Sequence, residues 1–187
     1  MTGDGSTGAP LLRDAEADDL AWVLDAHRAV YVAGLGWPPA FLDLVATVMA
    51  GIAPRLLAAT GDPLRRERAW IAEADGERAG AVVLVAHDHD PSVAKLRLLI
   101  VTEDARGRGV GPALVAAAVA FARESGYARI ELWTEDSLAA ARRIYARAGF
   151  TIVATAPSEV MPGNVAETWS LDLNAGQRVA SGAPESG

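Results

Sequence analysis

Residues 96–127 constrain the fold of this chain more than any other stretch; they read LRLLIVTEDARGRGVGPALVAAAVAFARESGY. The first six are apolar apart from one arginine, which predicts a buried strand over 96–101. From Val110 onward, apolar side chains recur at helical spacing, which predicts a helix that begins near Gly109. The chain therefore passes from a strand into a helix through a short loop that is rich in glycine and arginine.

The loop between this strand and this helix has the composition of an anion-binding site. Gly107, Gly109 and Gly111 let the backbone take positive φ angles and expose its N–H groups. These amides gather at the helix N-terminus, where the helix dipole is positive, so a phosphate can bind there without a dedicated side chain. Arg106 and Arg108 add positive charge. We therefore predict a phosphate site at the start of this helix.

The residues that follow exclude two common phosphate-binding loops. Pro112 and Ala113 stand where a Walker loop has Lys and Ser or Thr, and the glycine spacing does not fit a dinucleotide fingerprint. Pro112 is compatible with the first turn of a helix, where its missing N–H is not needed. A glycine-rich turn that only caps a core helix remains the alternative reading of this loop.

Two motifs together resemble one protein family. The segment RGRGVG, residues 106–111, is similar to the coenzyme-A pyrophosphate loop of the GNAT superfamily of acyl-CoA N-acyltransferases. The segment AARRIYARAGF, residues 140–150, is similar to the tyrosine helix of that superfamily. LRLLIV, LWT and ETWSLDL also look like the acetyltransferase half of bacterial fusions that carry a MarR-type DNA-binding domain, which this sequence lacks. The resemblance covers about residues 11–173.

The order of the expected elements agrees with this resemblance. It implies an α/β (α+β) fold with a mixed, mostly antiparallel central sheet that is splayed midway and flanked by about four helices. We expect strands at 11–12, 70–72, 79–86, 96–101 and 129–134, from 150 and over 167–173, and helices at 18–31, from 41 to about 54, from 109 and over 137–148. Residues 10–173 are expected to form one domain between flexible tails, 1–9 and 174–187.

Net charge and amino-acid composition limit the classes of partner that the protein is expected to bind. A net charge of -7 argues against nucleic acid and an anionic membrane as partners, and tolerates a cationic amine. With no cysteine, the chain has no thiolate metal site and no cysteine nucleophile, so transfer from a thioester should be direct or use another group. We found no run near the roughly 18 apolar residues of a membrane span and no signal sequence at the start. The expected location is therefore the cytoplasm.

The resemblance implies acetyl-CoA as co-substrate and no metal. The backbone of Leu99, Ile100 and Val101 would meet the pantetheine arm and the acyl carbonyl at a splayed strand edge, where a β-bulge is common. An amide at that edge would stabilise the developing oxyanion. The pyrophosphate would contact the loop residues Arg106, Gly107, Arg108, Gly109, Val110, Gly111 and Pro112.

Tyr145 matches the family's tyrosine that protonates the departing thiolate, although a core tyrosine is the alternative reading. The general base is less clear, because Trp133 stands where some relatives have an acid. We take Glu131, on the same strand face, as the candidate base. Glu135 and Asp136 are expected to be solvated charges or helix-start acids. A water relay remains an alternative to Glu131 as the general base. The histidines are further alternatives, although we expect His27 to be packed in the core and His87 and His89 to lie in a turn.

The acceptor amine is expected to contact the first two helices, the loop between the last two strands and the strand at 129–134. The candidate contact residues are Tyr31, Trp37, Phe41, Trp133 and Met161. Ordinary packing explains these side chains equally well. The expected activity is transfer of an acetyl group from acetyl-CoA to a primary amine of a small molecule or protein. The alternative is a coenzyme-A-binding regulatory module with little turnover. A homodimer is left open.

Overall fold

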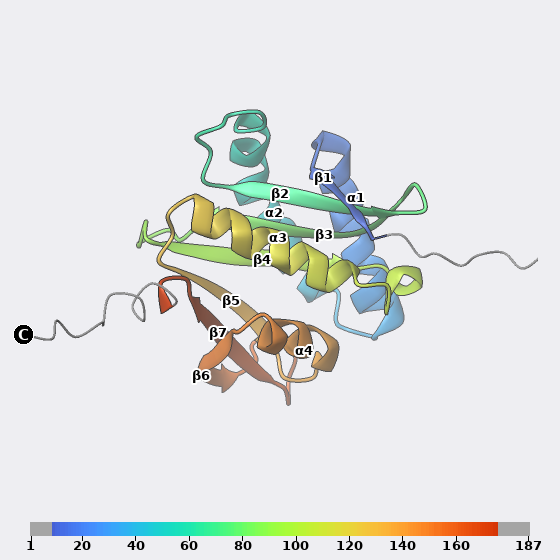
Figure 1. The fold of residues 1–187 in the computed structure, drawn as a ribbon. Helices are drawn as coiled ribbons and strands as arrows, with labels where there is room; N and C mark the ends of the chain where they lie inside the picture. The colour runs from blue at the N-terminus through green and yellow to red at the C-terminus, as the bar shows by residue number, and fades with distance from the viewer. Residues whose placement is uncertain (1–8, 176–187) are drawn as a thin grey trace, which may run out of the picture.

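The computed structural model describes residues 9–175, which form one seven-stranded sheet with helices on both faces (Figure 1). The strand order is β1-β2-β3-β4-β5-β7-β6, and every neighbouring pair is antiparallel except β4 and β5. The strands are β1 (Leu11–Asp14), β2 (Arg68–Ala74), β3 (Glu77–Ala86), β4 (Val93–Val101), β5 (Arg129–Glu135), β6 (Thr151–Pro157) and β7 (Val165–Asp172). The helices are α1 (Ala17–His27), α2 (Ala40–Ala58), α3 (Val110–Glu124), α4 (Ala139–Arg147) and the short η1 (Arg28–Gly34) and η2 (Glu103–Ala105). The expected mixed, mostly antiparallel sheet is confirmed.

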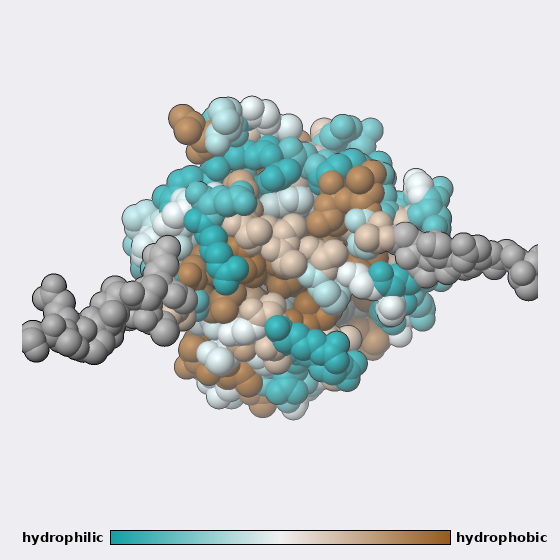
Figure 2. All heavy atoms as spheres, in the orientation of Figure 1, coloured by the Kyte–Doolittle hydropathy of each residue, from teal (hydrophilic) through white to brown (hydrophobic). Residues whose placement is uncertain are grey.

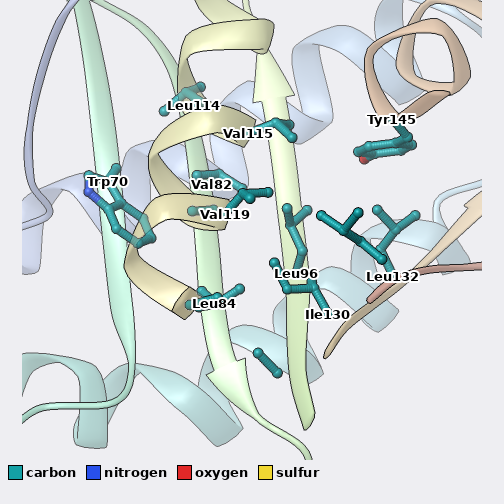
Figure 3. Close-up of a cluster of buried hydrophobic side chains, with 14 of the residues drawn as sticks. Trp70, Val82, Leu84, Leu96, Leu114, Val115, Val119, Ile130, Leu132 and Tyr145 are labelled. Carbon is teal, nitrogen blue, oxygen red and sulfur yellow. The ribbon is translucent and has the colours of Figure 1, made fainter. Parts of the chain in front are cut away.

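Two hydrophobic cores lie on opposite faces of the sheet. α3 and α4 lie on the near face in Figure 1, and α1 and α2 lie behind it. Figure 3 shows the near core, in which Leu114, Val115 and Val119 of α3 pack onto the strands. On the other face, α1 and α2 pack onto residues such as Ile71 and Val83.

The sheet separates in its middle, as expected. β4 and β5 pair only at Val93–Arg129, Ala94–Ile130 and Lys95–Glu131, and then diverge. The β3–β4 register slips between Ala81 and Val83, and Leu98 has a φ of 55°. This slip is the predicted bulge in β4. Because it lies where the two strands part, it turns the backbone of β4 toward the gap.

Two expectations about the first helix were wrong in detail, whereas α2 ends shortly after Pro54, as one of the two expected ends. The N-cap of α1 is Glu16, and Asp19 accepts from the Glu16 backbone N–H at 2.9 Å, which makes a capping box. The helix periodicity predicted through Tyr31 continues as the π-helix η1. α2 runs through Pro54 to Ala58, because Leu56, beyond the proline, is buried in the core.

α2 also corrects the expectation that no apolar run approaches the length of a membrane span. It has 19 residues and a mean hydropathy of 1.6, and 28% of its most apolar stretch of 18 residues is buried. Core helices of globular domains meet the same criteria, and α2 places Val45, Ile52 and Leu56 in the core. The helix itself was expected, but its apolar length was not, because Asp43 and Arg55 interrupt the run near its ends.

The predicted domain, residues 10–173, contains the whole sheet. The predicted tails, 1–9 and 174–187, lie outside the described residues except for Ala9, Asn174 and Ala175.

Candidate active site

The loop before α3 presents unpaired backbone amides. Gly107 and Gly109 have φ angles of 76° and 79°, and a Cβ at either position would meet no atom within 4 Å. Among the described residues, the N–H groups of Gly107, Gly109, Val110 and Gly111 have no backbone or side-chain acceptor. α3 has 15 residues, so these donors lie at the positive end of a full helix dipole. This geometry fits a phosphate group better than a simple cap, which would satisfy some of these donors.

The two arginines of the loop differ in their surroundings. Arg106 is exposed and has no ion pair within the described part of the chain. Arg108 is held away from the loop, because its Nη2 lies 2.6 Å from Oδ2 of Asp75 in the β2–β3 turn. Arg106 is therefore the side chain that can add charge to a bound phosphate without first breaking an ion pair.

Gly111 allows α3, α4 and β4 to approach one another. A Cβ at Gly111 would lie 2.7 Å from Cδ1 of Ile144 and 3.5 Å from Cγ2 of Val101. The first distance is a clash. The phosphate loop is thus fixed against both the splayed strand and the helix that carries Tyr145.

The strand residues predicted to meet the acyl carbonyl lie at the bulge. Leu99 and Val101 pack toward α3, whereas Ile100 is buried under α1 and α2. Their side chains therefore pack in the two cores, as those of an ordinary buried strand do. Their backbone is different, because beyond Lys95 it has no pairing with β5 on the side of the gap.

Tyr145 enters the near core from α4, and its hydroxyl points away from that helix (Figure 3). Its ring centroid lies 6.0 Å from Phe150 and 6.3 Å from Trp169. Burial raises the pKa of its phenol above the usual value, and Tyr31 contributes to the same shift. The side chain is both a core residue and a protonated phenol near the gap.

A buried carboxylate holds α4 in place. Oε2 of Glu167 on β7 accepts from Arg142 Nε at 2.9 Å and from Trp169 Nε1 at 2.9 Å. Because Arg142 lies one turn before Tyr145, this pairing fixes the helix that carries the phenol.

The predicted acceptor residues do come together. Centroids of the Tyr31, Trp37 and Phe41 rings lie 4.8 Å apart in all three pairs, and Met161 packs against the cluster. Trp37 and Phe41 are buried, so these rings fill most of the space that they surround. Burial raises the pKa of Tyr31 to about 12, partly offset by Arg106. Arg106 of the phosphate loop therefore acts electrostatically on Tyr31 of the aromatic cluster.

Glu131 and Trp133 lie on the other face of β5 from Tyr145. Glu131 is opposite Lys95, at the closed end of the gap, and its Oε1 accepts from Arg129 Nε at 3.0 Å. Trp133 lies farther along the strand and is 42% exposed. The structure thus places Trp133 in the open part of the gap and Glu131 at its base, engaged in an ion pair.

Glu135 was expected to be solvated, and this was wrong. It has no exposed surface, its Oε1 accepts from Ser158 Oγ at 2.5 Å, and its Oε2 has no partner in the described residues. Burial raises the pKa of this carboxyl. Strand alternation places Glu135 on the face of Trp133, but its burial depends on the β6–β7 connection, which folds back from far along the chain.

The three histidines do not form a second site. Nδ1–H of His27 donates to the Val23 carbonyl at 2.7 Å, and burial lowers the pKa of His27 to about 4, so the ring is neutral and packed as expected. His87 and His89 lie in the β3–β4 turn, where β4 begins, away from the gap. Within residues 9–175, no group of three or more His, Cys, Asp or Glu side chains could hold a metal.

Comparisons with known proteins agree on one family. The sequence model of the Acetyltransferase (GNAT) family matches residues 37–150. Mycothiol acetyltransferase of Beutenbergia cavernae is 35% identical over 85 residues, which are 46% of this chain and 29% of that protein. N-acetylaspartate synthetase of Rattus norvegicus is 32% identical over 94 residues, which are 50% of this chain and 31% of that protein. The match thus spans about a third of the length of these curated relatives.

Solved structures share the fold. A GNAT-family protein from Desulfovibrio desulfuricans superimposes with a TM-score of 0.69 and 21% identity, over 88% of this chain and 99% of that one. An acetyltransferase from Salmonella typhimurium, solved with its cofactor acetyl-CoA, superimposes with a TM-score of 0.66 and 19% identity, over 96% of this chain and 100% of that one. The expected fold class is confirmed. The similarity to MarR fusions is not tested by these matches.

Proposed function

The chain belongs to the GNAT acetyltransferase family, and we propose that it transfers an acetyl group from acetyl-CoA to a primary amine of a small molecule or protein. The observation that carries this proposal is the joint geometry of two backbone surfaces. Four unpaired amides lie at the start of α3, and a bulged strand edge opens beside them where β4 leaves β5. Such a pair suits a ligand with a pyrophosphate at one end and an amide-bearing arm at the other.

The protein fits this ligand on its own residues. The amides of Gly107, Gly109, Val110 and Gly111 would hold the pyrophosphate, with Arg106 adding charge. The open edge of β4 near Leu99, Ile100 and Val101 would orient the arm and polarise the acyl carbonyl. These contacts use backbone atoms, so they do not depend on side chains that also fill the cores.

Proton transfer would involve two groups. The acceptor nitrogen attacks the acyl carbon, the new C–N bond forms as the C–S bond breaks, and the sulfur takes the proton of the Tyr145 hydroxyl. A phenol is protonated at neutral pH, so Tyr145 has the proton that this step needs. Burial raises its pKa and so makes the hydroxyl a weaker acid than a free phenol. The ammonium proton goes to Glu131, through water across the gap, or to bulk water. The proposed transfer is direct, and the chain has no cysteine that could carry the acyl group.

One observation favours the alternative, a coenzyme-A-binding regulatory module with little turnover. Trp133 fills the position where an acid was expected, and Glu131, the candidate base, is held by Arg129. Such a protein would keep the phosphate loop but transfer acetyl groups slowly.

Calorimetric titration with acetyl-CoA, followed by a thiol-release assay over a panel of amines, separates these proposals. Gly109→Glu should abolish binding, because it places a side chain and a negative charge in the phosphate site. The matched control is Gly126→Glu at the other end of α3, where φ is 74° and a Cβ also meets nothing within 4 Å. It should bind normally. Equal affinity in both folded variants overturns the cofactor assignment, and binding without thiol release favours the regulatory module.

A further inference from the structure

Arg97 lies on β4 directly before Leu98, the bulged residue. It pairs across the sheet with Val83, which belongs to the core under α1 and α2. Opposite residues of an antiparallel pair point to the same face, so Arg97 extends toward that face. By the same alternation, the side chain of Lys95 lies on this face. Glu131 pairs with Lys95, so Glu131 and Trp133 of β5 lie on this face too.

The guanidinium of Arg97 is unusual in having no partner. It is half-buried, yet within residues 9–175 it forms no hydrogen bond, ion pair or aromatic contact. The other described arginines that lack such contacts are all exposed: Arg28, Arg106, Arg123, Arg143 and Arg147. Partial burial of a cation without a counter-ion costs free energy. Burial accordingly lowers the pKa of Arg97, with Asp88 opposing the shift and Arg55 adding to it.

Within residues 9–175, no carboxylate forms an ion pair with Arg97, although Asp88 acts on its charge from farther away. Asp88 is directed to Lys95, at 3.6 Å from Nζ, and Glu131 is bound by Arg129. Beyond Lys95, β4 has no strand partner on the β5 side, so the backbone at Arg97 borders the gap. Across that gap Trp133 is 42% exposed.

We propose that Arg97 binds a carboxylate of the acceptor, which makes the acceptor a small amine that also carries a carboxylate, of the amino-acid class. A guanidinium donates two parallel hydrogen bonds to a carboxylate, and in a half-buried site this pairing is both strong and selective. Arg97 adjoins the bulge where the acyl carbon would be held. An acceptor that reaches both points at once has its amine and its carboxylate a few bonds apart.

This inference rests on the proposed acetyl transfer and refines its substrate. It disfavours polycationic amines and lysine side chains of proteins, which offer no carboxylate beside the amine. The chemistry of the transfer is unchanged: the amine nitrogen forms the new C–N bond, and the sulfur leaves with the proton of Tyr145.

The test compares amino acids with their primary amides as acceptors, in the wild type and in Arg97→Gln. The ratio of kcat/KM for acid over amide is measured in each protein, because dividing one ratio by the other removes the intrinsic reactivity of the two amines. This quotient should be about 10- to 100-fold, the usual worth of a charge-assisted pair. Arg97→Lys should retain part of it. Arg147→Gln, which removes an exposed arginine of α4, should leave the wild-type ratio unchanged.

A binding measurement keeps the inference separate from the proposed function. N-acetyl amino acids and their amides are titrated into the coenzyme-A-bound protein, which requires no turnover. At least tenfold tighter binding of the acid, lost in Arg97→Gln, supports the carboxylate site even if no amine is acetylated. Equal binding of acid and amide to the wild type overturns it, and that result does not depend on whether the variant folds. Acetylation of amines without that preference would leave the proposed function standing alone.

Discussion

Tyr145 is the candidate proton donor, so its hydroxyl is the residue-level test of the mechanism. Tyr145→Phe keeps the ring packing against Phe150 and Trp169, and acetyl-CoA affinity should change little. kcat should fall about a hundredfold, the usual contribution of a general acid. Tyr127→Phe is the control, because that buried hydroxyl donates to the Arg66 carbonyl away from the gap. Nearly full kcat in Tyr145→Phe, where chemistry limits the rate, would make Tyr145 a core residue only.

Glu135 predicts a pH dependence of stability. Its folded-state pKa is raised by burial, so folding favours the neutral carboxyl. The resulting stabilisation is full below the unfolded-state pKa and is lost as pH rises through the higher folded-state pKa. The free energy of unfolding of the wild type, relative to Glu135→Gln, should therefore be greatest near about pH 4 and decline toward neutral pH. Urea unfolding of both proteins at several pH values measures this difference. An advantage that grows with pH would contradict the assignment.

Local pattern predicted the site residues whose role depends on the backbone. Glycine spacing placed the open loop before α3, whereas the expected role of Tyr145 came from the family resemblance. The pairing of Arg108 with Asp75 was not predictable, since 33 residues separate them and the contact depends on how the β2–β3 turn meets the loop. The burial of Glu135 was missed for the same reason, because Ser158 lies 23 residues away. Contacts between distant segments have no local signature.

At the scale of elements, β3 and α3 meet at a glycine that sets the position of the phosphate loop. A Cβ on Gly80 would lie 2.7 Å from the Ile100 carbonyl oxygen and 2.9 Å from Val110 Cγ1. Gly80→Ala should therefore destabilise the protein by about 1–3 kcal/mol and weaken acetyl-CoA binding. Thermal unfolding and calorimetry measure the two effects.

The control substitution lies in α2. Gly51→Ala meets no atom within 4 Å in the middle of a helix, so it should stabilise by about 1 kcal/mol and leave binding unchanged. If both substitutions had the same sign of effect on stability, the close approach at Gly80 would not be what positions α3.

Periodicity predicted the type of most elements, and packing decided where the helices end. The period-two pattern predicted the two strands of the β2–β3 hairpin, which turns at Asp75 and Gly76. In contrast, the π-helical turn of η1 depends on the tertiary position of Tyr31, whose carbonyl accepts from Leu35 and Trp37. α2 passes Pro54 because burial of Ile52 and Leu56 on either side outweighs one lost backbone hydrogen bond.

At the scale of the whole molecule, the two parts of the sheet are joined by three residue pairs between β4 and β5. At the β6 edge of the sheet, the apolar side chains of Ile152 and Val153 are exposed on the surface (Figure 2). Sequence reasoning gave the splay through family resemblance only, because the alternation of residues in β4 and β5 is the same whether the strands pair along their full length or part midway.

The divergence of β4 from β5 leaves central-strand amides without a partner, and amide hydrogen exchange can observe this. In the free protein, the amides of residues 98–101 that face the gap should exchange within seconds, whereas those bonded to β3 should stay protected. Acetyl-CoA should protect the exposed set and the amides of the α3 loop together. Slow exchange at all four residues without ligand would mean that the gap is closed in solution. Mass spectrometry of short peptides around Leu98 thus reads the open strand edge directly, independently of any catalytic assay.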